Sequence, residues 1–387
     1  MKDGFRVMDA DRHVMEPEDL YDRYLEPEFK GKVYISPGRK QRIVDGRPVS
    51  DNTNAPSGGG MTLGEGYRAC YPEAVAADFD APSNLHDMDR EGVDVAVLFP
   101  TVGLYIMWAD FIAPRLSAGI CRAYNNWLAD YCSADRERLH GVMLIPLQDP
   151  ELACEELRRA SKDLGLVGIF WRPNVLCGRT MSSPDYFPVY ELAQELGVTV
   201  CVHEGARTVL PQAGSDRFSE FTRHAVCHPF EQMLALGNFC GDGVLEKFPE
   251  LKVAHLEAGC GWLPFWLDRL DEHWDRAGAR VRTTAERPSW YFKRQCMIST
   301  EAGEEFVHDV VHHVGADYVV MATDYPHPDA IGKFPDHTVG DLSGNEDLSA
   351  EVRRKILWDN PARLYGIEDP HLTSRSAKGE EQRVVHA

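Results

Sequence analysis

The sequence predicts an α/β protein in which eight parallel strands alternate with helices and close into a (β/α)8 TIM barrel. Two observations predict this fold: short apolar runs recur along the 387 residues, and stretches with helical spacing lie between several of them. The runs are nearly continuous in apolar residues, as expected for parallel strands that are buried on both faces. In chain order, they lie at residues 5–13, 93–99, 139–145, 166–172, 199–204, 251–257, 295–300 and 318–324.

Three of the intervening stretches carry recognisable helix boundaries. Residues 83–92 open with Ser83, a residue type favoured at helix N-caps, and close on Gly92. Residues 149–165 and 185–197 also end on a glycine. A doubly wound open sheet is the alternative architecture, but no G-x-G-x-x-G motif follows the first strand. The barrel is therefore favoured.

One long segment interrupts this alternation. It covers residues 31–82, and within it residues 49–66 are rich in Gly, Ser, Asn and Pro and predict a long loop. In a barrel this insertion follows the first strand, on the face where active sites form. A substrate lid and an oligomer contact both remain open for it. We expect one barrel domain over residues 1–369 and a flexible tail over 370–387.

The charge and the amino-acid composition indicate which kinds of binding partner the protein can have. A net charge of −20 argues against nucleic acid or an anionic membrane surface. The chain has no apolar run of the roughly 20 residues that span a bilayer, and the N-terminus lacks the apolar segment of a signal peptide. The ten cysteines include no C-x-x-C pair and many lie in apolar surroundings. We therefore expect a cytoplasmic protein that acts on a small molecule.

Acids and histidines gather at the C-terminal ends of four predicted strands. In a barrel those ends converge on one mouth. Residues two apart share a strand face, so Asp11 and His13 are expected to point together, as are His255 and Glu257. Imidazole and carboxylate side chains are ligands for divalent transition metals, so the set predicts a metal site. Its members are Asp11, His13, His203, Glu204, His255, Glu257, Asp324 and, just beyond the last strand, His327.

Four further polar residues are candidates for this site. Glu16 follows the first strand, where the chain can turn it back toward the metal, so we count it among the ligands. Asp9 lies deeper in the strand and is expected to be structural or to lie behind the metal ligands. His224 and His228 lie four residues apart on a predicted helix but lack the adjacent glutamate of an H-E-x-x-H motif. We expect His228 to be structural or to lie behind the metal ligands.

Five segments carry a resemblance to a known family: "MDADRHVMEP", "CVHEG", "KVAHLEAGCGWLPFWLDRLDE", "MATDYPHPD" and "KILWDNPARLYG". They run from residue 8 to about residue 367. Together they resemble the amidohydrolase-2 branch of the amidohydrolase-related family, which includes aminocarboxymuconate-semialdehyde decarboxylase. The resemblance implies a TIM barrel of the metal-dependent hydrolase type, with a divalent metal at its mouth.

The resemblance also implies roles for individual residues. Asp11 and His13 correspond to the first-strand ligand pair, where H-x-H is common and this chain has Asp. His203 and Asp324 correspond to the ligands on the fifth and eighth strands. His255 occupies the position of the general acid/base histidine.

Three functions are compatible with these residues. The first is hydrolysis or non-oxidative decarboxylation of a small, carboxylate-bearing substrate with the help of Zn or Mn. In this reaction Asp324 would accept a proton, and His255 would either polarise the reacting group or serve as a metal ligand. The second is a dinuclear iron or manganese oxygenase, in which one or two of Glu16, Glu204, Glu257 and His327 complete a second metal position. The third is a non-catalytic partner subunit. With this family resemblance, the long loops at the mouth also imply a homodimer.

Overall fold

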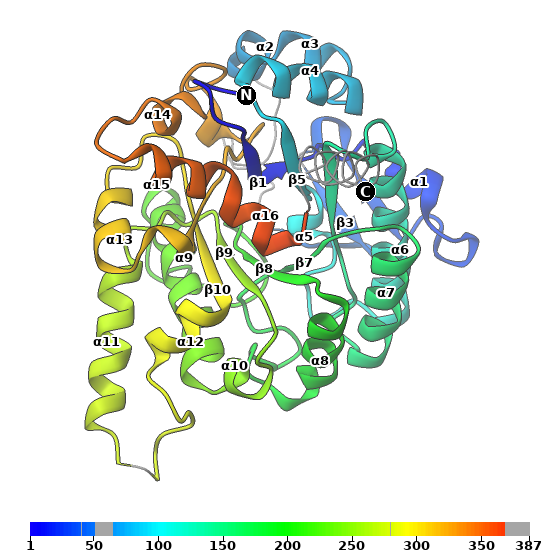
Figure 1. Cartoon of the computed structure of the whole chain (residues 1–387). Helices are drawn as coiled ribbons and strands as arrows, with labels where there is room; N and C mark the ends of the chain where they lie inside the picture. Colours follow the sequence, from blue (N-terminus) through cyan, green and yellow to red (C-terminus); the bar gives the residue numbers. More distant parts are fainter. Residues whose placement is uncertain (40, 51–64, 279, 368–387) are drawn as a thin grey trace, which may run out of the picture.

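The computed structural model describes residues 1–39, 41–50, 65–278 and 280–367. Its centre is a nearly closed barrel of eight parallel strands surrounded by helices (Figure 1), so the predicted (β/α)8 fold is confirmed. Every predicted strand is present. In sheet order the strands are β1 (Met8–His13), β5 (Val95–Phe99), β6 (Leu139–Met143), β7 (Gly168–Trp171), β8 (Thr199–His203), β9 (Val253–Leu256), β10 (Cys296–Thr300) and β11 (Val319–Met321).

The first and last strands meet at the seam of the barrel. The backbone N–H of Asp324, just past β11, donates to the carbonyl of Asp11 at 3.1 Å, and the N–H of His13 donates to the carbonyl of Tyr325. The register of β1 against β5 shifts between Asp9 and Arg12. This irregularity lies next to the two predicted ligands of β1.

Helices cover the outside of the barrel. The longer ones are α4 (Ala81–Glu91), α6 (Pro114–Cys132), α7 (Pro150–Lys162), α8 (Phe187–Leu196), α9 (Glu220–Leu236), α11 (Leu263–Arg276), α12 (Pro288–Gln295) and α13 (Val307–His313). The shorter ones are α1 (Leu20–Tyr24), α2 (Glu65–Cys70), α3 (Pro72–Ala76), α5 (Gly103–Ile106), α10 (Val244–Lys247), α14 (Gly340–Ser343), α15 (Ala350–Arg354) and α16 (Asn360–Tyr365).

The start of α4 differs from the sequence prediction. The N-cap is Asp80, whose side chain accepts a hydrogen bond from the backbone N–H of Ser83 at 2.9 Å. Ser83 therefore lies inside the first turn instead of preceding it. The other end is as predicted, because Gly92 adopts the left-handed conformation that ends many helices.

Helix α16 closes the N-terminal end of the barrel. The Thr199 hydroxyl at the start of β8 donates to the carbonyl of Leu364 at 2.7 Å, and the Tyr365 hydroxyl donates to the carbonyl of Ala10 at 2.9 Å. The C-terminal ends of the strands are left for the opposite, functional end, which we call the mouth.

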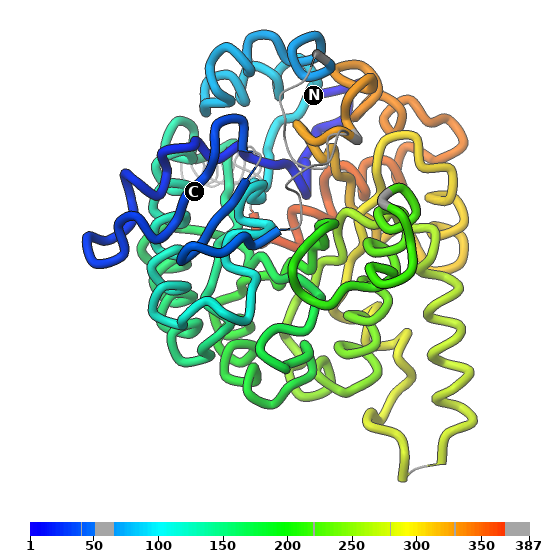
Figure 2. The backbone as a smooth tube through the Cα atoms, turned by 180° about the vertical axis from the view of Figure 1, so that it is seen from behind, coloured from blue at the N-terminus to red at the C-terminus, as the bar shows by residue number. Residues whose placement is uncertain are grey.

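The insertion after β1 lies against the mouth. It contains a small antiparallel sheet of β2 (Val33–Ile35), β3 (Arg42–Val44) and β4 (Arg47–Pro48), followed by α2 and α3. Ser50 forms a backbone bridge with Thr208, in the segment after β8, and Figure 2 shows the blue insertion beside that green segment. Most of the predicted loop (residues 51–64) and the predicted tail (370–387) lie outside the described residues.

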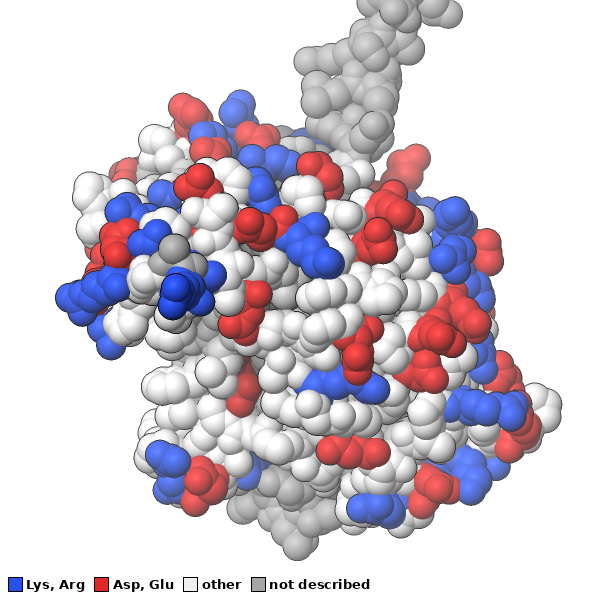
Figure 3. All heavy atoms as spheres, turned by 90° about the horizontal axis from the view of Figure 1, so that it is seen from below, with Lys and Arg blue, Asp and Glu red and all other residues white. Residues whose placement is uncertain are grey.

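The surface carries mixed charge. On the face drawn in Figure 3, basic and acidic side chains are interspersed and form no continuous basic stripe among the described residues. Within the same part of the chain, no helix combines the length and apolarity needed to cross a membrane.

A buried ion pair connects the barrel to α4. Arg12 Nη1 lies 2.6 Å from Glu91 Oε2, and neither side chain is exposed. Arg12 Nε also donates to Asn84, and the Thr338 hydroxyl donates to Glu91. The barrel interior cannot solvate the guanidinium of Arg12. The carboxylate of Glu91 therefore supplies much of the charge and hydrogen bonding that the guanidinium loses on leaving water.

Replacing Glu91 with alanine is expected to lower the free energy of unfolding by about 3–5 kcal/mol, because it leaves Arg12 charged and buried without this partner. Urea denaturation followed by circular dichroism measures the change. Asp89→Ala on the same helix is the matched control: Asp89 is 65% exposed and pairs with Arg138 at the surface, so its loss should change stability by no more than about 1 kcal/mol. Equal losses in the two variants would contradict the prediction.

Candidate metal centre

Two histidines face each other at the mouth. His13 ends β1 and His203 ends β8, and their Nε2 atoms lie 3.1 Å apart. Each Nδ1 lies against a backbone carbonyl, that of Pro100 at 2.9 Å and that of Glu204 at 2.7 Å. A carbonyl only accepts, so each Nδ1 must be the protonated nitrogen that donates. In the neutral rings both Nε2 atoms then present lone pairs to one another, an arrangement that fits a cation between them.

Asp11 completes this arrangement from β1. Its two carboxylate oxygens lie 3.5 Å from His13 Nε2 and 3.4 Å from His203 Nε2. Both oxygens are buried and have no hydrogen-bond partner among the described residues. An uncompensated buried carboxylate is costly, and a bound cation would compensate it. Ligand atoms of Asp11, His13 and His203 lie within 4.8 Å of one another, as the ligands of one ion must.

A second group of ligands adjoins the first. Asp324, just after β11, places Oδ1 3.3 Å from His13 Nε2 and 2.8 Å from His327 Nδ1. Glu257, just after β9, places Oε2 2.8 Å from His203 Nε2. Ligand atoms of His13, Glu257, Asp324 and His327 also lie within 4.8 Å of one another. We call the six residues of both groups the mouth cluster: Asp11, His13, His203, Glu257, Asp324 and His327.

Backbone conformation aims two of these carboxylates at the mouth. Glu257 has φ +48° and Asp324 has φ +54°, both in the left-handed region that residues with a side chain rarely adopt. Each such residue stores about 1–3 kcal/mol of strain, and such strain is concentrated at functional sites. Glu257 follows β9 directly and Asp324 lies three residues after the end of β11, where the chain turns out of the barrel.

Electrostatics at the mouth cluster favour a bound cation. Burial, together with the negative charges of Asp324 and Glu257, raises the pKa of Asp11 well above its ordinary value. Burial, together with the charge of His327, lowers the pKa of His13 to about 4. His13 is therefore neutral near pH 7, as a metal ligand must be. Burial alone would raise the pKa of Asp324, but the charge of His327 holds it below its ordinary value.

The structure does not bring Glu16 into the mouth cluster. Its carboxylate accepts hydrogen bonds from the backbone N–H groups of Thr101, Val102 and Gly103, the last two at 2.8 Å. These amides begin α5, so Glu16 holds the turn after β5 instead of turning back toward a metal. This corrects the sequence-based expectation, which could not include a hydrogen-bond partner 85 residues away.

His255 is also not at the mouth, which corrects its expected position. In the parallel register it pairs with Val202, whereas Leu256 pairs with His203, whose side chain points inward. The His255 ring accordingly points outward, into the helix layer. It lies beside Phe239, Trp262 and Phe292, and its Nδ1 is 2.8 Å from Gln232 Oε1. Burial lowers its pKa to about 3, so the ring is neutral near pH 7.

Glu204 is held by a different partner. Its Oε1 lies 2.7 Å from Arg172 Nη2, and both side chains are fully buried. Gln212 donates to the same oxygen. Its carboxylate therefore supports the segment after β8 and lies outside the two groups that make up the mouth cluster.

Sequence reasoning underestimated His228 on α9. Its Nε2 lies 3.5 Å from Glu257 Oε1, on the far side of that carboxylate from His203. Burial alone would lower the pKa of His228, but contacts with the Cys227 thiol and with Glu257 raise it well above its ordinary value. The H-x-x-x-H spacing with His224 marked the residue, but nothing in the sequence indicates that α9 approaches the end of β9.

Sequence reasoning missed Arg42 in β3 altogether. Its side chain is 1% exposed, and its Nε and Nη1 atoms have no hydrogen-bond partner among the described residues. The guanidinium lies 4.5 Å from the centre of the Tyr105 ring on α5. The Tyr105 hydroxyl is in turn close to Gly205, where an added Cβ would meet it at 3.4 Å. Arg42 thus lies near the mouth with unused donors.

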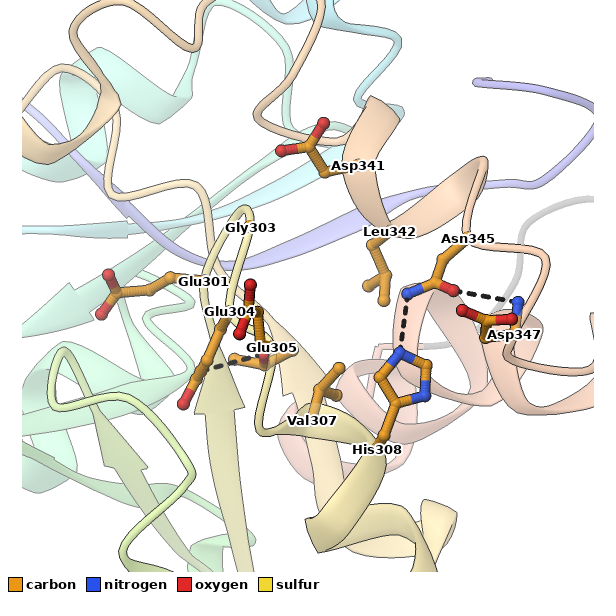
Figure 4. A pocket seen from close by; sticks show the side chains of 11 residues that line it. Glu301, Gly303, Glu304, Glu305, Val307, His308, Asp341, Leu342, Asn345 and Asp347 are labelled. Atoms are coloured by element: carbon orange, nitrogen blue, oxygen red, sulfur yellow. Dashed lines mark hydrogen bonds between the residues drawn. The ribbon is translucent and has the colours of Figure 1, made fainter.

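A cavity beside the mouth is separate from the mouth cluster. It has a volume of about 380 Å³ and is lined by several acidic residues between β10 and α14 (Figure 4). None of the six cluster residues lines it. Glu304 on its wall already accepts the backbone N–H groups of Cys260 and Gly261, and Asn345 is hydrogen bonded to His308. Its acids add negative potential next to the mouth.

Comparisons with known proteins agree with this fold. A family model described as amidohydrolase matches residues 8–367. A curated relative, 2-amino-3-carboxymuconate-6-semialdehyde decarboxylase from Dictyostelium discoideum, is 27% identical over 293 residues, which cover 75% of this chain and 77% of the relative.

Two solved structures share the whole architecture. An amidohydrolase from Mycobacterium avium subsp. paratuberculosis K-10 matches with a TM-score of 0.76 and 21% identity, covering 94% of this chain and 99% of its own. A dihydroxybenzoic acid decarboxylase from Polaromonas sp. JS666, with bound manganese and the inhibitor 2-nitroresorcinol, matches with a TM-score of 0.63 and 19% identity, covering 95% and 98%.

Proposed function

Because the chain belongs to the amidohydrolase family, we propose that it catalyses the non-oxidative decarboxylation of a small carboxylic acid with the help of manganese. It is a metal-dependent enzyme of the decarboxylase and hydrolase class. The relatives reported above are decarboxylases and an amidohydrolase, so the oxygenase alternative has no support and is withdrawn. The intact donor set likewise gives no reason to keep the non-catalytic alternative.

One observation carries the proposal: the Nε2 atoms of His13 and His203 lie 3.1 Å apart, and each lies within 3.5 Å of an oxygen of Asp11. Neither of these oxygens has a hydrogen-bond partner among the described residues. These three residues would hold the ion. Asp324 Oδ1 lies 3.3 Å from His13 Nε2 and would be a further ligand. Two imidazoles and carboxylate oxygens form a donor set that manganese and zinc both accept. A divalent ion held there would polarise a substrate carboxylate and the oxygen beside it.

Decarboxylation replaces a carbon–carboxylate bond with a carbon–hydrogen bond, so the site must deliver a proton to carbon. We assign this role to His228 in place of His255. Its raised pKa keeps a proton on the ring near pH 7. Glu257 lies between His228 and His203 and orients the protonated ring toward the mouth. General acid catalysis of this kind contributes about 10²- to 10⁴-fold.

Arg42 is proposed to bind an anionic group of the substrate. A buried guanidinium without a carboxylate partner is unfavourable in the free enzyme, and a substrate carboxylate or phenolate would satisfy its two unused donors. The Tyr105 ring holds the planar group from one face. The insertion that carries Arg42 would thereby act as part of the substrate-binding wall.

Arg42→Met is expected to raise KM about 10- to 100-fold, since a hydrogen-bonded charge contributes about 1.5–3 kcal/mol. Metal content and melting temperature should stay near those of the wild type, because methionine removes an uncompensated buried charge and keeps most of the volume. Steady-state kinetics measures KM. Arg47→Met, at an exposed arginine of the same insertion, is the control and should leave KM unchanged. An unaltered KM in Arg42→Met would remove this residue from the binding site.

The reaction itself is tested by carbon dioxide release. Protein reconstituted with manganese is incubated with a panel of hydroxylated aromatic and unsaturated carboxylic acids, and with amides of the same acids. We expect metal-dependent release of carbon dioxide from at least one of the acids. Hydrolysis of the amides without decarboxylation of any acid would show that the enzyme is a hydrolase.

Three further properties complete the proposal. Residues 1–369 would form one domain, with the insertion 31–82 contributing to the wall of the mouth. The enzyme would be cytoplasmic.

The enzyme would form a homodimer through α9 and α11, where Phe230, Leu234 and Phe265 are more than half exposed. Light scattering during gel filtration should give twice the mass of one chain, and the mass of a single chain would exclude the dimer.

A further inference from the structure

The mouth cluster holds more ligands than one ion can use. A divalent transition ion binds its nitrogen and oxygen ligands at about 2.0–2.2 Å, so any two ligand atoms of one ion lie within roughly 4.4 Å of each other. Among the described residues, ligand atoms of the six cluster side chains do not all lie within 4.8 Å of one another. They form two groups within that distance, and the two groups share only His13.

His13 can serve only one of these groups. Its Nδ1 donates to the Pro100 carbonyl, which leaves Nε2 as its single free ligand atom. That atom is 3.1 Å from His203 Nε2, so it belongs with Asp11 and His203. The remaining group then consists of Glu257, Asp324 and His327, which supply two carboxylates and one imidazole.

We propose that Glu257, Asp324 and His327 form a second divalent-cation site beside the one assigned to Asp11, His13 and His203. The inference rests on the proposed metal-dependent function and extends it to a two-metal centre. Two carboxylates and an imidazole form a ligand set suited to manganese or zinc.

The orientation of each side chain agrees with this site. The Nε2 of His327 lies 3.0 Å from the Thr101 hydroxyl, which leaves Nδ1 to face Asp324 Oδ1 at 2.8 Å. Glu257 directs Oε2 toward the cluster and Oε1 toward His228. Asp324 has two oxygens and can contact both ions, as carboxylates in two-metal sites do. Both carboxylates are placed by the strained left-handed residues described above.

A single ion at the mouth, with the remaining side chains paired by hydrogen bonds, explains fewer of these contacts. If one ion occupied the mouth, His327 would donate a hydrogen bond to Asp324, and Glu257 would accept hydrogen bonds from His203 and His228. His203, however, uses Nδ1 to donate to the Glu204 carbonyl, so only its Nε2 faces the mouth cluster. That one atom lies 3.1 Å from His13 Nε2, 3.4 Å from Asp11 Oδ2 and 2.8 Å from Glu257 Oε2. A single N–H could satisfy only one of these three contacts, whereas cations held between the side chains would satisfy all of them.

Metal content tests the second site without reference to activity. The full chain is stripped with a chelator, reloaded with excess manganese, freed of unbound ions by gel filtration and analysed by mass spectrometry of the metal. We expect two manganese ions per wild-type chain and one in His327→Ala and in Glu257→Gln. Glu301→Gln replaces an acid beside the cluster that belongs to neither group and should retain two.

Each other outcome has a defined meaning. One ion per wild-type chain overturns the second site and leaves the proposed function intact, whereas no bound ion overturns the proposed function itself. If a variant fails to fold, electron paramagnetic resonance of the wild type decides. A spin-coupled manganese pair is expected, and a spectrum of isolated ions only, at full loading, would overturn the inference.

Discussion

Replacing His203 with asparagine is expected to abolish metal binding at the first site and to lower kcat/KM by at least about 10³-fold. The Nε2 of His203 is one of the two nitrogens that converge at 3.1 Å, and asparagine is too short to place a ligand atom there. A bound metal supplies several kcal/mol of transition-state stabilisation, and each 1.36 kcal/mol corresponds to a factor of ten in rate.

Thermal unfolding with added manganese measures this loss independently of turnover. Metal at 100 times the dissociation constant of the first site should stabilise the wild type by about 2.7 kcal/mol through that site, and His203→Asn should lose this contribution. His140→Asn on β6 is the control, because His140 is outside the mouth cluster and should leave the metal-induced stabilisation unchanged. Wild-type metal content together with wild-type kcat/KM in His203→Asn would refute the assignment.

Replacing His228 with glutamine is expected to lower kcat by about 10²- to 10⁴-fold while the protein keeps its metal. Glutamine can still hydrogen bond to Glu257 but cannot release a proton to carbon near pH 7. The measurement is a steady-state assay combined with metal analysis. Because substrate binding does not depend on this proton, KM should change far less than kcat.

His255→Gln is the matched comparison. His255 lies in the helix layer and donates to Gln232, so this variant should retain activity and lose about 1–3 kcal/mol of stability from the disturbed buried contact. The reverse result, with His255→Gln inactive and His228→Gln active, would restore the role that the family resemblance gave to His255.

The barrel was predictable because its strands are buried on both faces. Such strands appear in the sequence as apolar runs, and each of the eight runs contains one observed strand. Four residues of the mouth cluster were also predictable for a topological reason. Asp11, His13, His203 and Asp324 lie at or within three residues of the C-terminal ends of their strands, and all barrel strands point to the same mouth.

The errors arose where one residue of register or a distant partner decides the outcome. His255 is a single position away from the inward-facing Leu256, and sequence patterns do not fix strand register that closely. Glu16 is captured by backbone amides of the turn after β5, which no local pattern announces. The importance of His228 and Arg42 depends on how α9 and the insertion pack against the mouth, and this is purely tertiary information.

Anomalous diffraction from crystals of the manganese-loaded enzyme tests the central claim most directly. Data collected on both sides of the manganese absorption edge locate the ion and exclude other elements. We expect a peak between His13 Nε2 and His203 Nε2, about 2 Å from each and in contact with the Asp11 carboxylate. A mouth without an anomalous peak, in protein that binds manganese elsewhere, would contradict the metal centre described here.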